Sequence, residues 1–256
     1  MRFMTLLVFL LALTTPAFAQ FGLIFPSDDL VSQGESPLLA LQVRLFDPKE
    51  HRFLELTRPK QFEVQLFGEA TDLLAGLKPA QEPKASAWAA EYTVKRPGDY
   101  LFHAEIAPRW EPAEEQFVVY HVKLCINAFG LEEGWDEPVG AEAEIVPLSR
   151  PYGLWTGNLF SGQVLVNGEP APYVAVEIAY LGMSPEGSPP VAAPAAAYRI
   201  QTVRADASGV FHYAMPRAGW WGFAATVDAD RTIKREGEEK PVSLVTSCWV
   251  QTRNMP

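Results

Sequence analysis

Apolar residues recur at every second position along most of this chain, and this period of two limits the possible folds more than any other feature. In residues 39–45 and 62–67, leucine, valine and phenylalanine alternate with mostly polar neighbours. Such alternation predicts half-buried β-strands, and the 18 glycines and 22 prolines supply turns between them. Only residues 69–77 favour a short helical turn. The pattern predicts an all-β chain made of immunoglobulin-like β-sandwiches.

The first 19 residues have the three parts of a cleavable secretory signal peptide. A basic Arg2 precedes an apolar run at residues 6–13, and Ala17 and Ala19 place small side chains at the −3 and −1 positions. We therefore expect export to the periplasm and a mature chain that begins at Gln20. The alternative is an uncleaved N-terminal anchor. No later run approaches the roughly 18 apolar residues of a membrane span, so we expect no membrane insertion of the mature chain.

The acidic charge excludes two classes of partner. Loss of Arg2 with the leader leaves 20 basic against 31 acidic residues, a formal net charge of −11. Nucleic acids and anionic membrane surfaces are bound through basic patches, which this composition does not favour. The sequence therefore predicts no nucleic-acid partner.

Turn signals divide the mature chain into two predicted sandwich domains, 20–147 and 148–256. In the first, residues 88–105 read as two strands around an Arg-Pro-Gly-Asp turn, and another strand is expected at 117–128. In the second, Asn167-Gly168 favours a type I′ hairpin, and the Asp-Ala-Ser-Gly turn at 206–209 precedes a strand. The order of these signals resembles the transthyretin-like, carboxypeptidase-regulatory-like sandwich. Residues 182–197 and the charged segment 228–240 are predicted surface loops.

Two cysteines leave two interpretations open. Cys125 and Cys248 each lie in a strand-like run, and an even number of cysteines in an exported chain permits a disulfide. Buried free thiols are the alternative.

No catalytic motif is present in the sequence. It contains no G-x-S-x-G, no HExxH and no phosphate-binding loop followed by lysine. We therefore expect that the protein is not an enzyme.

Two of the four histidines are candidate metal ligands. On one predicted strand, His103 faces the opposite side from Tyr100 and Phe102. On another, His121 shares a face with Lys123. Two such histidines can converge to supply imidazole nitrogens to Ni²⁺, Co²⁺, Cu²⁺ or Zn²⁺. The alternative to a metal site is that these are two unrelated surface or cavity histidines. His51, in a polar turn, and His212, on an outward strand face, are not candidates.

Two further groups have a functional and a structural interpretation. An acidic cluster could offer oxygen ligands, but its spacing matches no calcium loop and favours a solvated loop. Several tryptophans could form a sugar-binding platform, although such rings more often fill cores. These residues are Glu132, Glu133, Asp136 and Glu137 in the cluster, and Trp110, Trp135, Trp155, Trp220 and Trp221 among the tryptophans.

Five long motifs together resemble one bacterial family. They are FGLIFPSDD (21–29), PGDYLFHAEIAPRWEPAEEQF (97–117), INAFGLEEGWDEPVG (126–140), VPLSRPYGLWTGNLFSG (146–162) and ADASGVFHYAMPRAGWWGFAA (205–225). The chain resembles the NikK-like periplasmic accessory component of energy-coupling-factor nickel and cobalt transporters, a family also catalogued as a domain of unknown function. The resemblance covers nearly the whole mature chain. It implies binding of Ni²⁺ or Co²⁺ outside the inner membrane and partnership with inner-membrane metal transporter components.

The chain departs from this family at two positions. Members often begin the mature chain with a histidine, whose imidazole and α-amine can bind a metal together, whereas this chain has Gln20. Members also tend to read HYTK where this chain reads Tyr120-His121-Val122-Lys123, which displaces the histidine by one residue. Such a displacement moves a side chain to the opposite face of a strand. The predicted metal site therefore comprises His103, His121 and Gln20. The alternative function is an interaction module that has lost metal binding.

Overall fold

The computed structural model describes residues 20–81, 85–182 and 194–256. Its elements are almost all β-strands, which confirms the predicted all-β class. The predicted signal peptide and most of the predicted loop at 182–197 lie outside the described residues. Among the residues that are described, no helix is long and apolar enough to cross a membrane.

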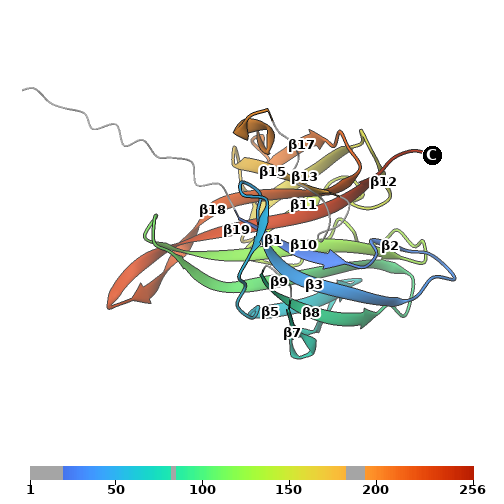
Figure 1. Ribbon diagram of the computed structural model, residues 1–256, viewed down its shortest axis with the longest axis horizontal. Helices are drawn as coiled ribbons and strands as arrows, with labels where there is room; N and C mark the ends of the chain where they lie inside the picture. The colour runs from blue at the N-terminus through green and yellow to red at the C-terminus, as the bar shows by residue number, and fades with distance from the viewer. Residues whose placement is uncertain (1–19, 82–84, 183–193) are drawn as a thin grey trace, which may run out of the picture.

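The strands of the described residues form three sheets (Figure 1). The five-stranded sheet consists of β1 (Phe21–Pro26), β3 (Leu38–Asp47), β4 (Arg52–Leu54), β7 (Lys78–Gln81) and β8 (Ser86–Thr93). The ten-stranded sheet consists of β2 (Leu30–Val31), β5 (Gln61–Leu66), β6 (Glu69–Asp72), β9 (Gly98–Glu111), β10 (Gln116–Ala128), β12 (Leu154–Trp155), β15 (Ala175–Gly182), β16 (Ile200–Arg204), β18 (Gly219–Arg235) and β19 (Glu238–Arg253). The four-stranded sheet consists of β11 (Ala143–Pro147), β13 (Leu159–Val166), β14 (Glu169–Pro170) and β17 (Val210–Ala214). The described ranges also contain the short 3-10 turns η1 (Leu74–Gly76) and η2 (Ala196–Tyr198).

The ten-stranded sheet belongs to both sandwiches. Its strands run in the order β16-β15-β18-β19-β10-β9-β5-β6, and β10 and β19 pair in parallel at the centre. The half that contains β10, β9 and β5 faces the five-stranded sheet across one hydrophobic core. The half that contains β15, β18 and β19 faces the four-stranded sheet across a second core. Two sandwiches are therefore present, but a continuous sheet joins them.

Most predicted strands and turns are confirmed. Residues 38–47 and 61–66 form β3 and β5. Burial alternates along β5 and the first half of β3, as the sequence pattern requires, whereas residues 43–46 are all buried. Asn167 and Gly168 have positive φ angles of 52° and 81°, as a type I′ turn demands. Residues 69–77 are partly different from the prediction, because 69–72 pair with β5 before the short turn η1.

The segment 228–240 is not a loop, so that prediction was wrong. It forms the outer part of the β18–β19 hairpin, with Arg235 opposite Glu238 and a turn at Glu236-Gly237. In Figure 1 this hairpin extends beyond the sheets beside the tip of the β9–β10 hairpin. Its charged side chains are solvated on a strand rather than in a loop.

The division between the sandwiches also differs from the predicted boundary at 147. β11 pairs with β13 over residues 143–147, so the second sandwich includes these residues. Cys125 and Cys248 are free and buried, which is the second of the two interpretations given above. Burial raises the pKa of the Cys248 thiol to about 12, so this thiol is poorly nucleophilic.

Candidate functional site

His103 and His121 lie side by side on neighbouring strands of the ten-stranded sheet. In the antiparallel pairing of β9 and β10, His103 is opposite Lys123 and His121 is opposite Glu105. Both histidines therefore project from the face that points away from the core of the first sandwich. Each is only 3% exposed. The structure thus brings together the two histidines that the strand pattern selected.

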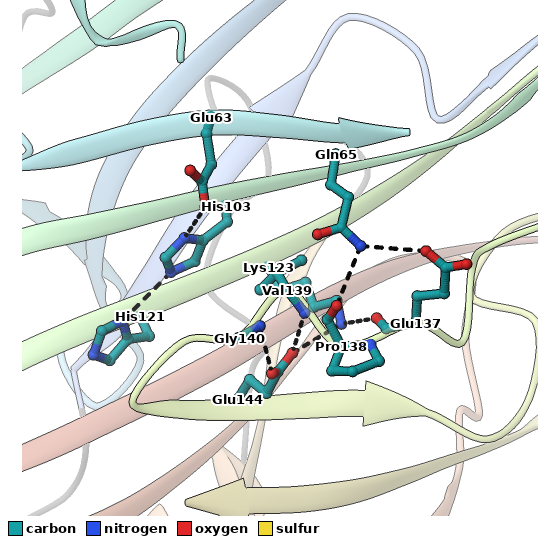
Figure 2. A network of polar contacts seen from close by, with 10 residues as sticks. All are labelled: Glu63, Gln65, His103, His121, Lys123, Glu137, Pro138, Val139, Gly140 and Glu144. Carbon is teal, nitrogen blue, oxygen red and sulfur yellow. Dashed lines mark hydrogen bonds and ion pairs between the residues drawn. The ribbon is translucent and has the colours of Figure 1, made fainter. Parts of the chain in front are cut away.

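Glu63, His103 and His121 form a chain of polar contacts (Figure 2). Oε1 of Glu63 on β5 lies 3.3 Å from Nδ1 of His103, and Nε2 of His103 lies 3.4 Å from Nδ1 of His121. A carboxylate can only accept a hydrogen bond, so Nδ1 of His103 donates to it. A neutral His103 ring then presents its lone pair at Nε2, toward His121. The two imidazole planes are nearly parallel, with an angle of 11° between them.

A polar cavity of about 270 Å³ adjoins these rings. Carboxylates and cations line it together with the histidines: Lys60, Glu63, Glu105, Glu142 and Arg231. Glu105 pairs with Lys60, and Glu142 pairs with Arg231 of β18. In the part of the chain that the structure describes, the buried Nε2 of His121 has no hydrogen-bond partner. An unpaired buried polar atom beside a polar cavity points to a missing ligand.

One wall of the cavity is held in place by a buried ion pair. Nζ of Lys123 lies 3.1 Å from Oε2 of Glu144 and donates to the backbone oxygen of Glu137 at 2.7 Å. Glu144 in turn accepts hydrogen bonds from the backbone nitrogens of Val139 and Gly140, at 2.9 and 3.0 Å. Figure 2 shows this network directly beside the histidine chain. It fixes residues 137–140 over the sheet, and Val139 and Gly140 line the cavity.

The environment keeps His121 neutral. Burial, and then the neighbouring His103, lower the pKa of His121 from 6.5 to about 4, whereas Glu105 and Glu142 act weakly in the opposite direction. The hydrogen bond from His103 lowers the pKa of Glu63, so this carboxyl is ionised near neutral pH. His121 is therefore an unprotonated imidazole under ordinary conditions, which is the form that coordinates a metal.

We expect the unfolding free energy of the protein to fall as the pH is lowered from about 6.5 to about 4. In this range the unfolded chain binds a proton at His121 and the folded chain does not, so protonation favours unfolding by about 3 kcal/mol in total. Groups facing His121 are His103, Glu105, Glu142 and Arg231. Urea denaturation from pH 7 to 4 on the wild type and on His121→Gln measures the effect. Between pH 6.5 and 4, the unfolding free energy of the wild type should fall by this amount more than that of the variant. An equal fall in the two proteins would contradict the prediction.

Gln20, the third predicted ligand, lies elsewhere. Its Oε1 accepts hydrogen bonds from the hydroxyl of Tyr120 and from Nη1 of Arg109, both at 3.0 Å. Tyr120 packs in the core of the first sandwich, on the opposite face of β10 from His121. The structure therefore does not bring Gln20 to the histidine pair. The side chain at position 120, where the resembling family has histidine, faces residue 20.

The other sequence candidates do not gather into a site. Trp220 and Trp221 are buried in different cores, while Trp155 is 40% exposed on β12, so the tryptophans form no common platform. In the acidic cluster, Glu132 pairs with Arg150, and Glu137 accepts a hydrogen bond from Gln65. Among the described residues, no group of three or more His, Cys, Asp or Glu side chains could hold a metal ion.

Sequence reasoning missed Glu63, Glu105, Glu142 and Arg231 as neighbours of the histidines. The alternation in β5 places Glu63 on the outward face of its strand, but only the pairing of β5 with β9 sets it opposite His103. Glu142 and Arg231 meet over a separation of 89 residues. No local signal in the sequence specifies these contacts.

Comparisons with known proteins identify a family without assigning an activity. Residues 17–229 match the model of a domain of unknown function, DUF4198. No curated protein matches the chain.

Several solved structures share a loose likeness of fold. The D0-D1 domain of intimin is 9% identical, with a TM-score of 0.23 and coverage of 89% of this chain and 96% of that one. The Yersinia pseudotuberculosis adhesin InvE is 11% identical, with a TM-score of 0.26 and coverage of 88% and 58%. The trypsin-activated alpha-2-macroglobulin of Escherichia coli is 10% identical, with a TM-score of 0.23 and coverage of 93% and 16%.

Proposed function

We infer that this chain, which belongs to the DUF4198 family, is an exported accessory protein that holds a divalent transition metal ion loosely and passes it on. Its cargo is Ni²⁺ or Co²⁺, bound at His103 and His121. The proposed recipient is an inner-membrane metal transporter component, as the resemblance to the NikK-like accessory family implies. The predicted signal peptide and the acidic composition are compatible with this role outside the inner membrane.

The main support for this proposal is the distance between the facing nitrogens of His103 and His121. A tetrahedral metal ion with nitrogen ligands at about 2.0–2.1 Å holds neighbouring nitrogens about 3.3–3.4 Å apart. Nε2 of His103 and Nδ1 of His121 are 3.4 Å apart. An ion between them would replace their hydrogen bond, and the proton of His121 would move to the unpartnered Nε2. Glu63 supports this arrangement, because a carboxylate on Nδ1 of His103 orients the ring and makes it a better ligand.

The small number of protein ligands favours a transported cargo over a permanent cofactor. Two imidazoles alone leave coordination positions to water, so the ion can be released readily. Glu105 and Glu142 line the same cavity but are each paired with a cation, Lys60 and Arg231. Their negative charges still attract a cation into the cavity, although they add no strong ligand.

Replacing His103 or His121 by alanine is expected to weaken Ni²⁺ or Co²⁺ binding about tenfold or more, because each removes one of two nitrogen ligands. The double variant should be little worse than either single variant, since they share one site. Calorimetric titration of the mature protein checks this. His212→Ala is the matched control, because His212 contacts Ser161 on another sheet and should leave binding unchanged. Equal binding by all variants would exclude the site.

The alternative function, an interaction module without metal binding, is favoured by the position of Gln20. Its side chain is held by Tyr120 and Arg109, apart from the histidine pair. The variant Gln20→His restores the family-like N-terminus, and its imidazole and free α-amine should add metal binding at residue 20 in the mature protein, apart from the histidine pair. If the wild type binds no divalent transition metal while Gln20→His does, the interaction-module interpretation replaces the first.

A further inference from the structure

A second cleft, of about 250 Å³, is lined mainly by residues of the second sandwich. The turn that follows β3 closes one side of it, with Glu50 and His51 in its wall. The other walls come from β15, β16, β17 and β18. Its lining shares no residue with the cavity beside His103 and His121. The volume is below the ~300–1,000 Å³ of pockets for drug-sized molecules, so its ligand is small.

Aromatic rings form the floor of this cleft. The ring centres of Tyr180 and Trp221 are 4.8 Å apart, and those of Tyr213 and Trp221 are 5.7 Å apart. Their polar atoms are already bonded within the protein: the Tyr180 hydroxyl donates to Ala218 O, and Trp221 Nε1 donates to Arg217 O. The rings therefore offer apolar surface rather than hydrogen bonds. Tyr198, which is 62% exposed, stands at the rim.

Two arginines give the cleft a positive charge that contrasts with the acidic chain. Arg199 donates from Nη1 to the backbone oxygen of Lys49 at 3.2 Å, and the guanidinium of Arg217 lies 5.5 Å from the ring centre of Tyr180. Over the described ranges, neither guanidinium forms an ion pair with a carboxylate. Glu50 is the single acidic residue in the described lining, against two guanidinium groups.

We propose that this cleft binds a small aromatic carboxylate. The flat ring of the ligand packs on Tyr180, Tyr198 and Trp221, and its carboxylate pairs with Arg199 and Arg217. A guanidinium matches a carboxylate in shape and charge and forms two parallel hydrogen bonds with it. A neutral sugar would use the aromatic floor but gain nothing from the arginine charges. A cationic ligand would be repelled by them.

The test compares an acid with its neutral amide on the full mature protein. Indole-3-acetate and indole-3-acetamide share the same ring, so the difference in their dissociation constants reports the charge interaction. Ligand-detected NMR and calorimetry, both with a chelator present, measure binding. We expect the acid to bind about tenfold or more tightly than the amide, because charge-assisted pairs are the stronger ones. The double variant Arg199→Gln/Arg217→Gln should abolish this preference.

Further variants separate the parts of the proposal. Tyr198→Ala should weaken the acid and the amide alike, and the exposure of Tyr198 makes misfolding a small concern. Arg204→Gln is the matched control, because Arg204 ends β16, the strand that begins just after Arg199, but donates to the backbone oxygen of Tyr173 outside the cleft. Three outcomes would overturn the proposal. The acid and the amide bind equally, neither indole compound binds, or maltose binds in a way that does not depend on the arginines. None of these outcomes bears on metal binding at His103 and His121.

Discussion

Replacing Lys123 by methionine is expected to lower the unfolding free energy by about 3–5 kcal/mol, because it leaves the charge of Glu144 buried without its partner. Both side chains are only 2% exposed. Lys123 also donates to the backbone oxygen of Glu137, so this acceptor loses its partner as well. Chemical denaturation of the two proteins under the same conditions measures the loss.

Two comparisons separate this pair from ordinary surface charges. The double variant Lys123→Met/Glu144→Gln should recover part of the loss, because neither isolated charge remains in the interior. At the exposed pair of Lys234 and Glu239, whose side chains are 76% and 51% exposed, Lys234→Met should cost less than about 1 kcal/mol. Similar losses at the two sites would show that the interior pair has no special role.

The Lys123–Glu144 pair also connects stability to the proposed metal site. Glu144 holds the backbone of Val139 and Gly140, which line the cavity beside His121. Strand alternation puts Lys123 and His121 on the same face, so one sheet face carries both the proposed metal ligand and the lysine that anchors the cavity wall.

The sequence was sufficient to predict most of the strands and turns, although not the strands within 228–240, and it did not predict the partners of each strand. Alternation, Asn167-Gly168 and Gly209 are local signals, and the structure bears them out. The parallel pairing of β10 with β19 joins positions more than 100 residues apart, such as Lys123 and Cys248. Nothing in either strand specifies that register, and two separate domains were therefore expected where one shared sheet exists.

The candidate site was predictable to the extent that it depends on strand parity. Parity put His103 on the opposite face from Tyr100 and Phe102 and put His121 on the same face as Lys123. It also implied that a one-residue displacement changes the face of β10, as Tyr120 and His121 show. It could not supply Glu63, which reaches His103 only through the pairing of β5 with β9. Nor could it show that residue 20 lies against Tyr120, because that contact joins residues 100 positions apart.

Trp249 illustrates how the two halves of the chain depend on each other. It is 1% exposed, and its indole nitrogen donates to the backbone oxygen of Gly22 on β1 at 2.7 Å. The rings of Phe21 and Phe46 pack against it edge-on, at 5.9 and 6.3 Å between ring centres. On its other side, a Cβ atom at Gly222 would lie 2.6 Å from the indole, so only glycine leaves room there. A residue of β19 thus completes the core of the first sandwich.

We expect Trp249→Ala to lower the unfolding free energy by about 3–5 kcal/mol, because a large buried ring is replaced by a cavity. Since Trp249 lies in the shared sheet, the loss should appear in both sandwiches as one cooperative transition. Hydrogen exchange of β3 in the first sandwich and of β17 in the second checks this by following the two cores separately. Trp249→Phe should cost less, because a ring remains and Ser247 still donates to Gly22 at 2.8 Å. If β3 lost its protection while β17 kept it, the two sandwiches would be independent folding units despite their common sheet.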